Sequence, residues 1–375
     1  MKNFIFDLKS KIDNTTPIKT FKDLEQEVIL AEKCCACGAC IAYCESQSFN
    51  VIEIDNYSPK FKSEKNADNC TECGVCYYIC PQTFALSEKL GNFYFIDNEI
   101  GHILKILAAK TTNPAIEKVG QDGGIVSTLL AYLFERRKID AAIVSEYNEN
   151  FEPIPKIIFD KEDLLKSAGT RYYISSQILP LKDLYNISQE ILEKKHIIDI
   201  DQIRIAFVGT PCQCRAISKM KLLHIKPAHV IKYNISLFCF ENFNYNQLSN
   251  ILKKEINVKS NDIQKTWIKK NFFVKTKNDK EFEVNIKTLD PAVRKHCKDC
   301  DEFTGKFSDI SIGAAGAPKG NSMILIRTET VEKIINSMLS EGFIEQFIVP
   351  TNQSIEWKNK KLSWFKKLIT LKVRS

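Results

Sequence analysis

The sequence CCACGACIAYC fills residues 34–44, and CTECGVCYYIC fills residues 70–80 and is followed by Pro81. Both stretches have the spacing C-x2-C-x2-C-x3-C, which is typical of a bacterial-type ferredoxin module that holds two 4Fe-4S clusters. Three closely spaced thiolates can surround one face of a cluster, whereas the fourth cysteine of each run ligates the other cluster. The spacing therefore predicts one cluster on Cys34, Cys37, Cys40 and Cys80, and a second on Cys70, Cys73, Cys76 and Cys44.

Zinc is the alternative occupant of these cysteines, but zinc sites usually draw on separated C-x2-C pairs that give four ligands per ion. Two complete four-cysteine runs favour iron-sulfur clusters instead. Glu45 stands at the position where the second run has Pro81. This departure changes the turn after the first run and leaves its ligands in place.

The composition is that of a soluble globular protein, with 375 residues, 44% hydrophobic and 26% charged. No apolar run reaches the length of a membrane span, and the N-terminus lacks the pattern of a signal peptide. We therefore expect a cytoplasmic protein, either free or held at the periphery of a membrane complex. In that compartment the 14 cysteines indicate metal or redox chemistry rather than disulfides.

The net charge of +7 reflects either an ordinary lysine-rich surface or attraction of an anionic ligand or an acidic partner protein. The sequence contains no nucleic-acid-binding motif, and a ferredoxin head argues against that class of protein. We expect no nucleic-acid partner.

The pattern of residues divides the chain into three predicted parts. Residues 1–100 would form the two-cluster ferredoxin-like domain with a short amphipathic lead-in and a strand at 49–55, and residues 101–114 would connect it to the second domain. Residues 101–350 read as a larger mixed α/β domain, and residues 351–375 as a basic, weakly patterned tail. In the larger domain the periodicity predicts helices at 125–137, 181–195, 213–223 and 330–343, strands at 139–145, 204–209, 229–240, 309–313 and 322–328, and a hairpin at 271–286.

Two glycine-containing motifs in the larger domain suggest an anion site. Gln121-Asp122-Gly123-Gly124 precedes a predicted helix, whose free N–H groups and dipole suit a pyrophosphate, although Gly-Gly before a helix is usually only a turn. The segment from Gly169 to Tyr172 combines a glycine turn, a hydroxyl, a guanidinium and an aromatic ring. It could hold a phosphate beside a planar ring, or it could be a loop with a capping threonine.

The sequence Gly209-Thr210-Pro211-Cys212 closes a predicted strand and opens a helix, which is where open α/β sheets bind ligands. A thiolate is stabilised at such a helix start, so Cys212 could be a nucleophile, a redox thiol or a metal ligand. Together with Cys239 and the C-x2-C pair Cys297 and Cys300 it makes four cysteines, which favours a metal site for either a cluster or zinc. The remaining Cys35 and Cys214 are expected to be spectators.

These motifs occur in a recognisable order: QDGGIVSTLLAYLFERRKIDAAIVS (121–145), AGTRYYISS (168–176), FVGTPCQCRAI (207–217), LFCFENFNY (237–245), HCKDCDEF (296–303), and DISIGAAGAPKG (309–320) with ILIRTE (324–329). Together they resemble the beta subunit of coenzyme F420-reducing hydrogenase. The two-cluster head makes the resemblance closer to the input subunit of F420H2 dehydrogenases. The resemblance covers roughly residues 31–345.

The resemblance implies an FAD-binding domain with a third 4Fe-4S cluster. Carried over by motif, the cluster ligands would be Cys212, Cys239, Cys297 and Cys300. The flavin would be held by Gly123, Gly124, Val126, Ser127, Thr128, Gly169, Thr170, Arg171, Tyr172, Thr210 and Pro211. Two departures, Gly320-Asn321-Ser322 in place of a tryptophan after the glycine and GTPC in place of a more apolar turn, remove no ligand.

The resemblance further implies an enzyme that oxidises reduced coenzyme F420 through FAD and passes single electrons through the clusters, reversibly, to a protein or a membrane-bound dehydrogenase complex, as in methanogenesis. No catalytic side chain is assigned, because the chemistry belongs to the cofactors. A ferredoxin-dependent flavin reductase of another small molecule, such as a tetrapyrrole, is the first alternative. A pure electron-relay subunit is the second, but it would need no flavin-binding motifs.

Overall fold

The structure is a computed structural model of the chain, and it describes residue 12 and residues 17–373. Half of the amphipathic lead-in predicted within residues 1–30, namely residues 1–11 and 13–16, lies outside the described residues. The part that is described, from residue 17 onward, contains a short α-helix that continues into one π-helical turn, α2 and η1 (Phe21–Leu24 and Glu25–Ile29).

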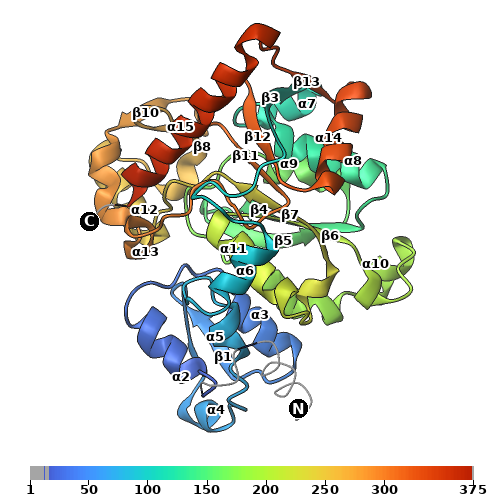
Figure 1. The fold of residues 1–375 in the computed structure, drawn as a ribbon. Helices are drawn as coiled ribbons and strands as arrows, with labels where there is room; N and C mark the ends of the chain where they lie inside the picture. The colour runs from blue at the N-terminus through green and yellow to red at the C-terminus, as the bar shows by residue number, and fades with distance from the viewer. Residues whose placement is uncertain (1–11, 13–16, 374–375) are drawn as a thin grey trace.

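The cysteine-rich head forms a separate lobe beneath the rest of the molecule (Figure 1). It pairs one β-hairpin with short helices. The predicted strand at 49–55 is confirmed as β1, which pairs antiparallel with β2. The elements are α3 (Ala39–Ser46), β1 (Ile52–Asp55), β2 (Ser58–Phe61), α4 (Glu64–Asp68), α5 (Val75–Ile79) and α6 (Ser87–Phe93).

Within the described residues, eight strands form one mixed sheet in the order β13-β3-β12-β11-β7-β6-β4-β5. The central pairs β11/β7, β7/β6 and β6/β4 are parallel, and the flanking pairs are antiparallel. This confirms a mixed α/β fold. The strands are β3 (Lys105–Thr111), β4 (Ala141–Tyr147), β5 (Pro153–Ile158), β6 (Ile205–Gly209), β7 (Ile231–Leu237), β11 (Ile310–Gly313), β12 (Ser322–Ile326) and β13 (Ile344–Gln346).

The two faces of the sheet pack against different layers. Along β6, Ala206 and Val208 belong to the core shared with helices α8 (Ile125–Glu135) and α14 (Glu329–Ser340). Ile205 and Phe207 point to the opposite face, which packs on helix α11 (Pro211–Leu222) and on the head. This is the alternation that a strand buried on both faces requires.

Three more described strands form a small antiparallel sheet, β10-β9-β8, beside helix α12. The predicted hairpin at 271–286 is confirmed as β9 and β10. The remaining elements are α7 (Pro114–Val119), α9 (Leu164–Ser167), the 3-10 helix η3 (Leu179–Asn186), α10 (Gln189–Lys194), α12 (Tyr245–Ile256), β8 (Ile263–Ile268), β9 (Phe272–Thr276), β10 (Glu281–Val284), the 3-10 helix η7 (Ile286–Ala292), α13 (Lys295–Lys298) and α15 (Ser354–Lys372).

Three expectations from the sequence were wrong in part. The predicted connector at 101–114 contains strand β3, which lies inside the large sheet between β12 and β13. The predicted helix at 181–195 is split, because η3 ends before Ile187 and α10 begins only after the Ser188 cap. The weakly patterned tail at 351–375 contains helix α15, whose Phe365 and Ile369 are buried against the sheet.

Candidate functional site

The two cysteine loops of the head have the same backbone conformation. In the first, Ala36 and Gly38 have positive φ angles of 50° and 85°, and in the second, Glu72 and Gly74 have 48° and 76°. Each glycine caps a helix that carries the third cysteine of its run. Such left-handed residues turn successive N–H groups toward one side, which creates a site for an anionic group.

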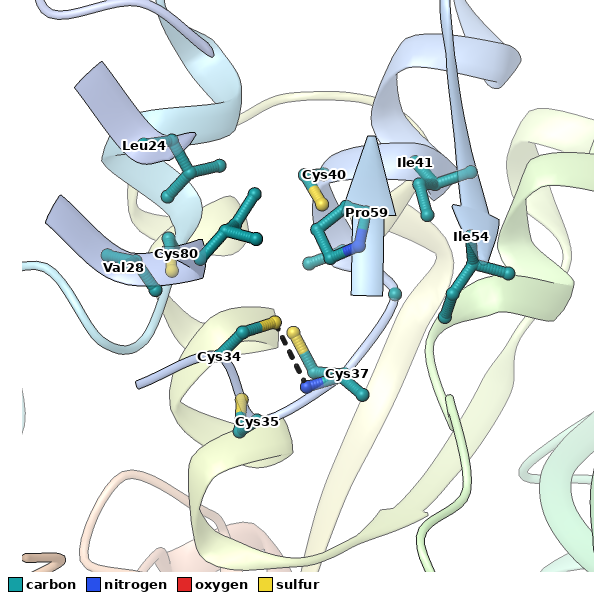
Figure 2. Close-up of a pocket in the computed structure, with 14 residues that line it drawn as sticks. Leu24, Val28, Cys34, Cys35, Cys37, Cys40, Ile41, Ile54, Pro59 and Cys80 are labelled. Carbon is teal, nitrogen blue, oxygen red and sulfur yellow. Dashed lines mark hydrogen bonds between the residues drawn. The ribbon is translucent and has the colours of Figure 1, made fainter. Parts of the chain in front are cut away.

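The first cavity of the head is lined by Cys34, Cys37, Cys40 and the distant Cys80, and it has a volume of about 410 Å³. Figure 2 shows these thiols around one space, with the apolar side chains of Leu24, Val28, Ile41 and Ile54 completing its wall. The Ala36 N–H donates a hydrogen bond to Cys34 Sγ at 3.4 Å. The structure therefore brings together the four cysteines that the spacing assigned to one cluster.

The second cavity, of about 380 Å³, is lined by the other four cysteines of the two runs, with Phe21, Tyr43 and Phe49 among its neighbours. Cys44, the last cysteine of the first run, lies in this second cavity. Cys80 lies in the first. The exchange of the fourth cysteine that the spacing predicted is thus present in the fold. The cysteines of this cavity are Cys44, Cys70, Cys73 and Cys76.

The four cysteines outside the head also converge, and we call them the core quartet: Cys212, Cys239, Cys297 and Cys300. Cys212 opens helix α11, Cys239 follows strand β7, Cys297 lies in α13, and Cys300 follows it. The thiols of Cys297 and Cys300 each interact electrostatically with Cys212. Cys239 interacts with the other three.

The three cysteine groups lie in a row. The thiol of Cys35, which lies next to Cys34 in the first cavity, interacts with the thiol of Cys212 of the core quartet. On the other side of that cavity, Cys40 interacts with Cys76 of the second cavity. Cys35, expected to be a spectator, therefore joins the core quartet to the head.

For Cys212 the contact with Cys35 is the largest influence on the thiol pKa, and for most of the other cysteines it is burial. It raises the pKa of Cys80 to about 11 and that of Cys297 to about 12, because a thiolate loses its hydration in an apolar surrounding. A metal centre would reverse this effect, since a coordinated thiol is deprotonated. Within the described residues, no group of three or more His, Cys, Asp or Glu side chains is close enough together to hold a single ion.

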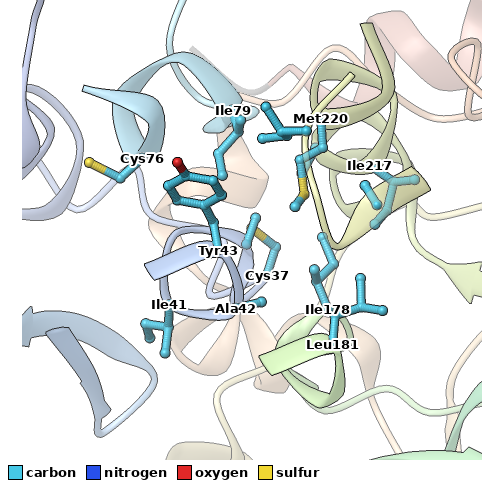
Figure 3. Packing of buried hydrophobic residues seen from close by; sticks show 14 of the residues in the cluster. Cys37, Ile41, Ala42, Tyr43, Cys76, Ile79, Ile178, Leu181, Ile217 and Met220 are labelled. Carbon is cyan, nitrogen blue, oxygen red and sulfur yellow. The ribbon is translucent and has the colours of Figure 1, made fainter. Parts of the chain in front are cut away.

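Helix α11 connects the core quartet to the head. The hydrophobic core is continuous here, because Ile217 and Met220 of α11 pack with Ile79 of the head and with Ile178 (Figure 3). Farther along the helix the fully buried Lys219 donates hydrogen bonds to the carbonyl oxygens of Cys80 and Thr83, at 2.6 Å and 2.9 Å. Burial and the nearby Arg215 lower the pKa of Lys219 to about 7.

The Gly-Gly motif lies where strand β3 ends and strand β12 begins, at one end of the large sheet. A Cβ atom on Gly123 would stand 2.5 Å from both Ala109 O and Ser322 N, so the tight packing between β3 and β12 requires this glycine. Gly124 has φ +67° and caps helix α8. The hydroxyl of the buried Thr128 is bonded to Thr111 Oγ1 at 2.6 Å, whereas Val126 and Ser127 remain partly accessible.

The second glycine motif forms a loop beside the first. Arg171 organises it: Nη1 donates to the carbonyl oxygens of Ala168 and Gly169 at 2.9 Å and 3.0 Å, and the guanidinium stacks 4.3 Å from the Tyr147 ring centre. Tyr172 accepts a hydrogen bond from the Ile268 N–H at 3.0 Å, which ties the loop to the small sheet. Thr170 O accepts a hydrogen bond from Tyr147 OH at 3.3 Å.

The Thr210-Pro211 turn joins this region to the core quartet. The Thr210 hydroxyl lies 3.3 Å from Cys212 Sγ, and Gln213 closes the turn by accepting from the Thr210 N–H at 2.8 Å. The amide of Gln213 also donates to Ser175 O at 2.7 Å. The second glycine motif and the GTPC motif are thus held together, as a shared cofactor site would require.

Two buried polar atoms in these loops lack a partner among the described residues: Gln121 Oε1, beside the Gly-Gly motif, and Arg171 Nε, in the second loop. An unpaired buried polar group costs free energy comparable to a lost hydrogen bond. The residues present therefore fit a polar ligand at this place.

The C-terminal helix supplies a residue that the sequence did not reveal. Lys372, in its last turn, is only 3% exposed. Its Nζ donates to the carbonyl oxygen of Cys239 at 2.9 Å and to that of Glu302. Burial, together with the charges of Arg294 and Lys372, lowers the pKa of His296 to about 3. The sequence gives no sign of this buried position, because Lys372 is one of many lysines in its segment.

The chain matches the family description "Coenzyme F420 hydrogenase/dehydrogenase, beta subunit N-term" over residues 106–182 and the corresponding C-terminal description over residues 203–349. It belongs to the coenzyme F420 hydrogenase/dehydrogenase beta-subunit family. The matched segments carry the two glycine motifs and the whole core quartet. Members of this family are subunits of oxidoreductases.

Two curated relatives support this family membership. The chain is 33% identical to a subunit of the F(420)H(2) dehydrogenase of Methanosarcina mazei, over 84% of this chain and 85% of that protein. It is 32% identical to coenzyme F420 hydrogenase subunit beta of Methanococcus voltae, over 65% of this chain and 84% of the relative.

A chain from the F420-reducing [NiFe] hydrogenase complex of Methanosarcina barkeri has the same fold over 72% of this chain and 93% of its own length, with a TM-score of 0.59 and 28% identity. Within the described residues, no helix combines the length and apolar character that crossing a membrane requires.

Proposed function

We propose that this protein is an iron-sulfur flavoprotein that oxidises reduced coenzyme F420 and delivers single electrons to a protein acceptor. The observation that carries the proposal is the row of three cysteine groups, which runs from the glycine-motif loops to the head. Membership in a coenzyme F420 family supplies the substrate class. A subunit that only relayed electrons would not need the loops beside the core quartet.

Three features support 4Fe-4S clusters over zinc in the cysteine groups. Each head cavity combines three cysteines of one run with the last cysteine of the other, which is the ligand pattern of a two-cluster ferredoxin module. Zinc sites usually draw on separated C-x2-C pairs that give four ligands per ion, whereas the head carries two complete four-cysteine runs. The left-handed residues Ala36 and Glu72 turn backbone N–H groups toward the loop interior, where bridging sulfides would accept them.

The glycine-motif loops support FAD as the cofactor beside the core quartet. The N-terminus of α8, after Gly124, would receive the pyrophosphate. Arg171 fixes the neighbouring loop through its Nη groups and leaves Nε for a ligand. Thr210 and Pro211 would place the cofactor next to Cys212. A bound flavin supplies the exchange between a two-electron hydride and single electrons that links a deazaflavin to clusters.

The described residues would hold the carriers in a fixed order. The core quartet lies beside the glycine-motif loops, the Cys34 cavity comes next, and the Cys44 cavity is the outermost. The head would therefore be the exit to the acceptor. The chain's own part in this function is to bind, to orient and to exclude water from the centres.

Anaerobic purification and reconstitution test the cofactor content. We expect about twelve irons per chain, from three clusters of four, together with one FAD. Reduced coenzyme F420 should then reduce a viologen dye, as followed by the absorbance of the deazaflavin. About eight irons with one zinc would contradict the third cluster, and absence of flavin would contradict the proposed enzyme activity. Reduction of the flavin by ferredoxin alone would favour a reductase of another small molecule.

A pair of cysteine variants tests the order of the carriers. Cys73→Ser should disturb the outer centre and block transfer to the dye while leaving flavin reduction by coenzyme F420 intact. Cys214→Ala is the matched control, because the buried Cys214 belongs to none of the three groups and contacts backbone carbonyls. Loss of flavin reduction in a folded Cys73→Ser protein would show that the proposed order is wrong.

A further inference from the structure

Helix α15 extends beyond both segments that match the family, yet it ends inside the candidate site. Figure 1 shows the helix running down to the chain terminus beside α13. Phe365 and Ile369 anchor it in an apolar core with Phe303. One turn later, Lys372 reaches between Cys239 and Glu302. The packing of helix α15 thus holds the ammonium group of Lys372 next to the core quartet.

This ammonium group lacks an ordinary counter-charge. Within the described residues no carboxylate forms an ion pair with Lys372, and its hydrogen-bond partners are two backbone carbonyl oxygens. Glu302, whose backbone oxygen Lys372 contacts, uses its carboxylate elsewhere: it accepts from the N–H groups of Gly305 and Lys306 and lies 3.7 Å from the Lys306 ammonium. A buried cation without a partner is strongly unfavourable.

The core quartet lies next to this cation instead. The charge of Lys372 acts on the thiols of all four cysteines: Cys212, Cys239, Cys297 and Cys300. The hydrogen bond to Cys239 O at 2.9 Å holds the Nζ of Lys372 beside them. A negatively charged centre bound by the four thiolates would complete the balance of charges.

We propose that Lys372 is the built-in counter-ion of the centre in the core quartet and raises the reduction potential of that centre. The proposal rests on the proposed function, because it requires a redox centre at these cysteines. Reduction adds one negative charge to the centre, and a fixed cation nearby stabilises the reduced form more than the oxidised form. The hydrogen bond to Cys239 O fixes the distance between the ammonium and the ligand backbone. Lys372 would therefore set the driving force of the first electron transfer, from the flavin to the centre in the core quartet, without itself touching the reacting atoms.

Anaerobic redox titration followed by electron paramagnetic resonance tests the proposal on the whole reconstituted protein. Lys372→Met keeps most of the side-chain length and removes the charge. At a fixed potential we expect the reduced-to-oxidised ratio of one centre to fall about tenfold, a shift of about 59 mV for one electron. The other two centres serve as internal references. Lys372→Arg should retain most of the wild-type potential, and Lys358→Met, an exposed position of the same helix, should change nothing.

The outcomes separate this proposal from the proposed function. A wild-type protein with only eight irons has no third centre, and it overturns both. Twelve irons with unchanged potentials in Lys372→Met overturn the role of Lys372 alone. If Lys372→Met loses iron from the core quartet, Lys372→Gln and Lys372→Arg decide: a shifted potential in the neutral variant and not in Arg supports the proposal, and equal potentials overturn it. Limited proteolysis of each variant reports whether α15 stays packed.

Discussion

The guanidinium of Arg294 donates a hydrogen bond from Nη2 to the carbonyl oxygen of Cys34 at 2.7 Å. Arg294 caps the short helix α13 that carries Cys297 of the core quartet. Cys34 begins the first cysteine run of the head. One side chain therefore ties the segment that carries a core-quartet cysteine to the first cysteine loop of the head.

This contact predicts a specific loss of stability. Arg294→Met should lower the free energy of unfolding by about 1.5–3 kcal/mol, the usual value for a hydrogen bond with a charged donor. Anaerobic urea denaturation followed by circular dichroism measures it. Lys295→Met is the control, because Lys295 contacts the head through an exposed ion pair with Glu32, and exposed ion pairs contribute little to stability. Equal losses in the two variants would contradict the prediction.

Arg171 should control the flavin content. Arg171→Ala frees the carbonyl oxygens of Ala168 and Gly169 and removes a charged donor, so the affinity for FAD should fall about tenfold to a hundredfold. The iron content should stay near normal, since no cysteine is touched. The FAD affinity of Arg171→Lys should lie between those of wild type and Arg171→Ala, because an ammonium keeps the charge but cannot make the paired hydrogen bonds of a guanidinium. FAD fluorescence after denaturation and iron analysis measure both quantities, and Arg136→Ala, on the exposed surface, is the control.

Gly123 should tolerate no side chain. In Gly123→Ala the new Cβ would meet two backbone atoms at 2.5 Å, and neither β3 nor β12 can move without breaking the sheet. We expect a loss of about 1–3 kcal/mol from overpacking, seen as a lower melting temperature. Gly91→Ala is the matched control, because a Cβ there meets no atom within 4 Å and alanine favours the helix α6. A normal melting temperature for Gly123→Ala would show that this end of the sheet is looser than described.

The ion pair between Asp140 and Arg204 predicts a pH dependence. Burial opposes ionisation of Asp140, but the hydrogen bonds from Arg204, at 2.7 Å and 2.9 Å, outweigh burial and hold its pKa below the ordinary value. The pair therefore stabilises the fold fully above the unfolded pKa of about 3.9, and the contribution is lost as the pH falls through the lower folded value.

Asp140→Asn should accordingly lose about 1–2 kcal/mol of unfolding free energy at pH 7, and the difference from wild type should shrink below about pH 4. Urea denaturation at a series of pH values measures it. Asp279→Asn is the control, because Asp279 is 79% exposed and sits in a turn with positive φ that asparagine accepts. A difference that stays constant with pH would rule out the carboxylate as its source.

The sequence allowed the cysteine groups to be predicted because ligand spacing is a local property. The exchange of Cys44 and Cys80 between the two head cavities followed from spacing alone. The strands β4 and β6 were also predictable, since they are short apolar runs bounded by turns. The core quartet was harder to predict, because its cysteines come from three separated segments, and the resemblance strengthened an assignment that the residues only favoured.

Other features depend on contacts that no local pattern encodes. Strand β3 reads as a connector, since its apolar residues are followed by polar ones and its partners β12 and β13 come more than 200 residues later. The burial of Lys372 depends on where α15 packs, whereas a lysine in a basic segment would be expected to be exposed to solvent. The contact between Cys35 and Cys212 likewise exists only once the head has packed on α11.

Helix α11 has a consequence for electron transfer under the proposed function. It starts with Cys212 in the core quartet and, seven residues or about 10 Å later at 1.5 Å per residue, anchors the Cys80 loop through Lys219. The head and the sheet share one apolar core, so we expect the head to stay fixed in place during turnover. Transfer between the proposed centres should then involve no diffusive step, and its rate should not depend on the viscosity of the solvent.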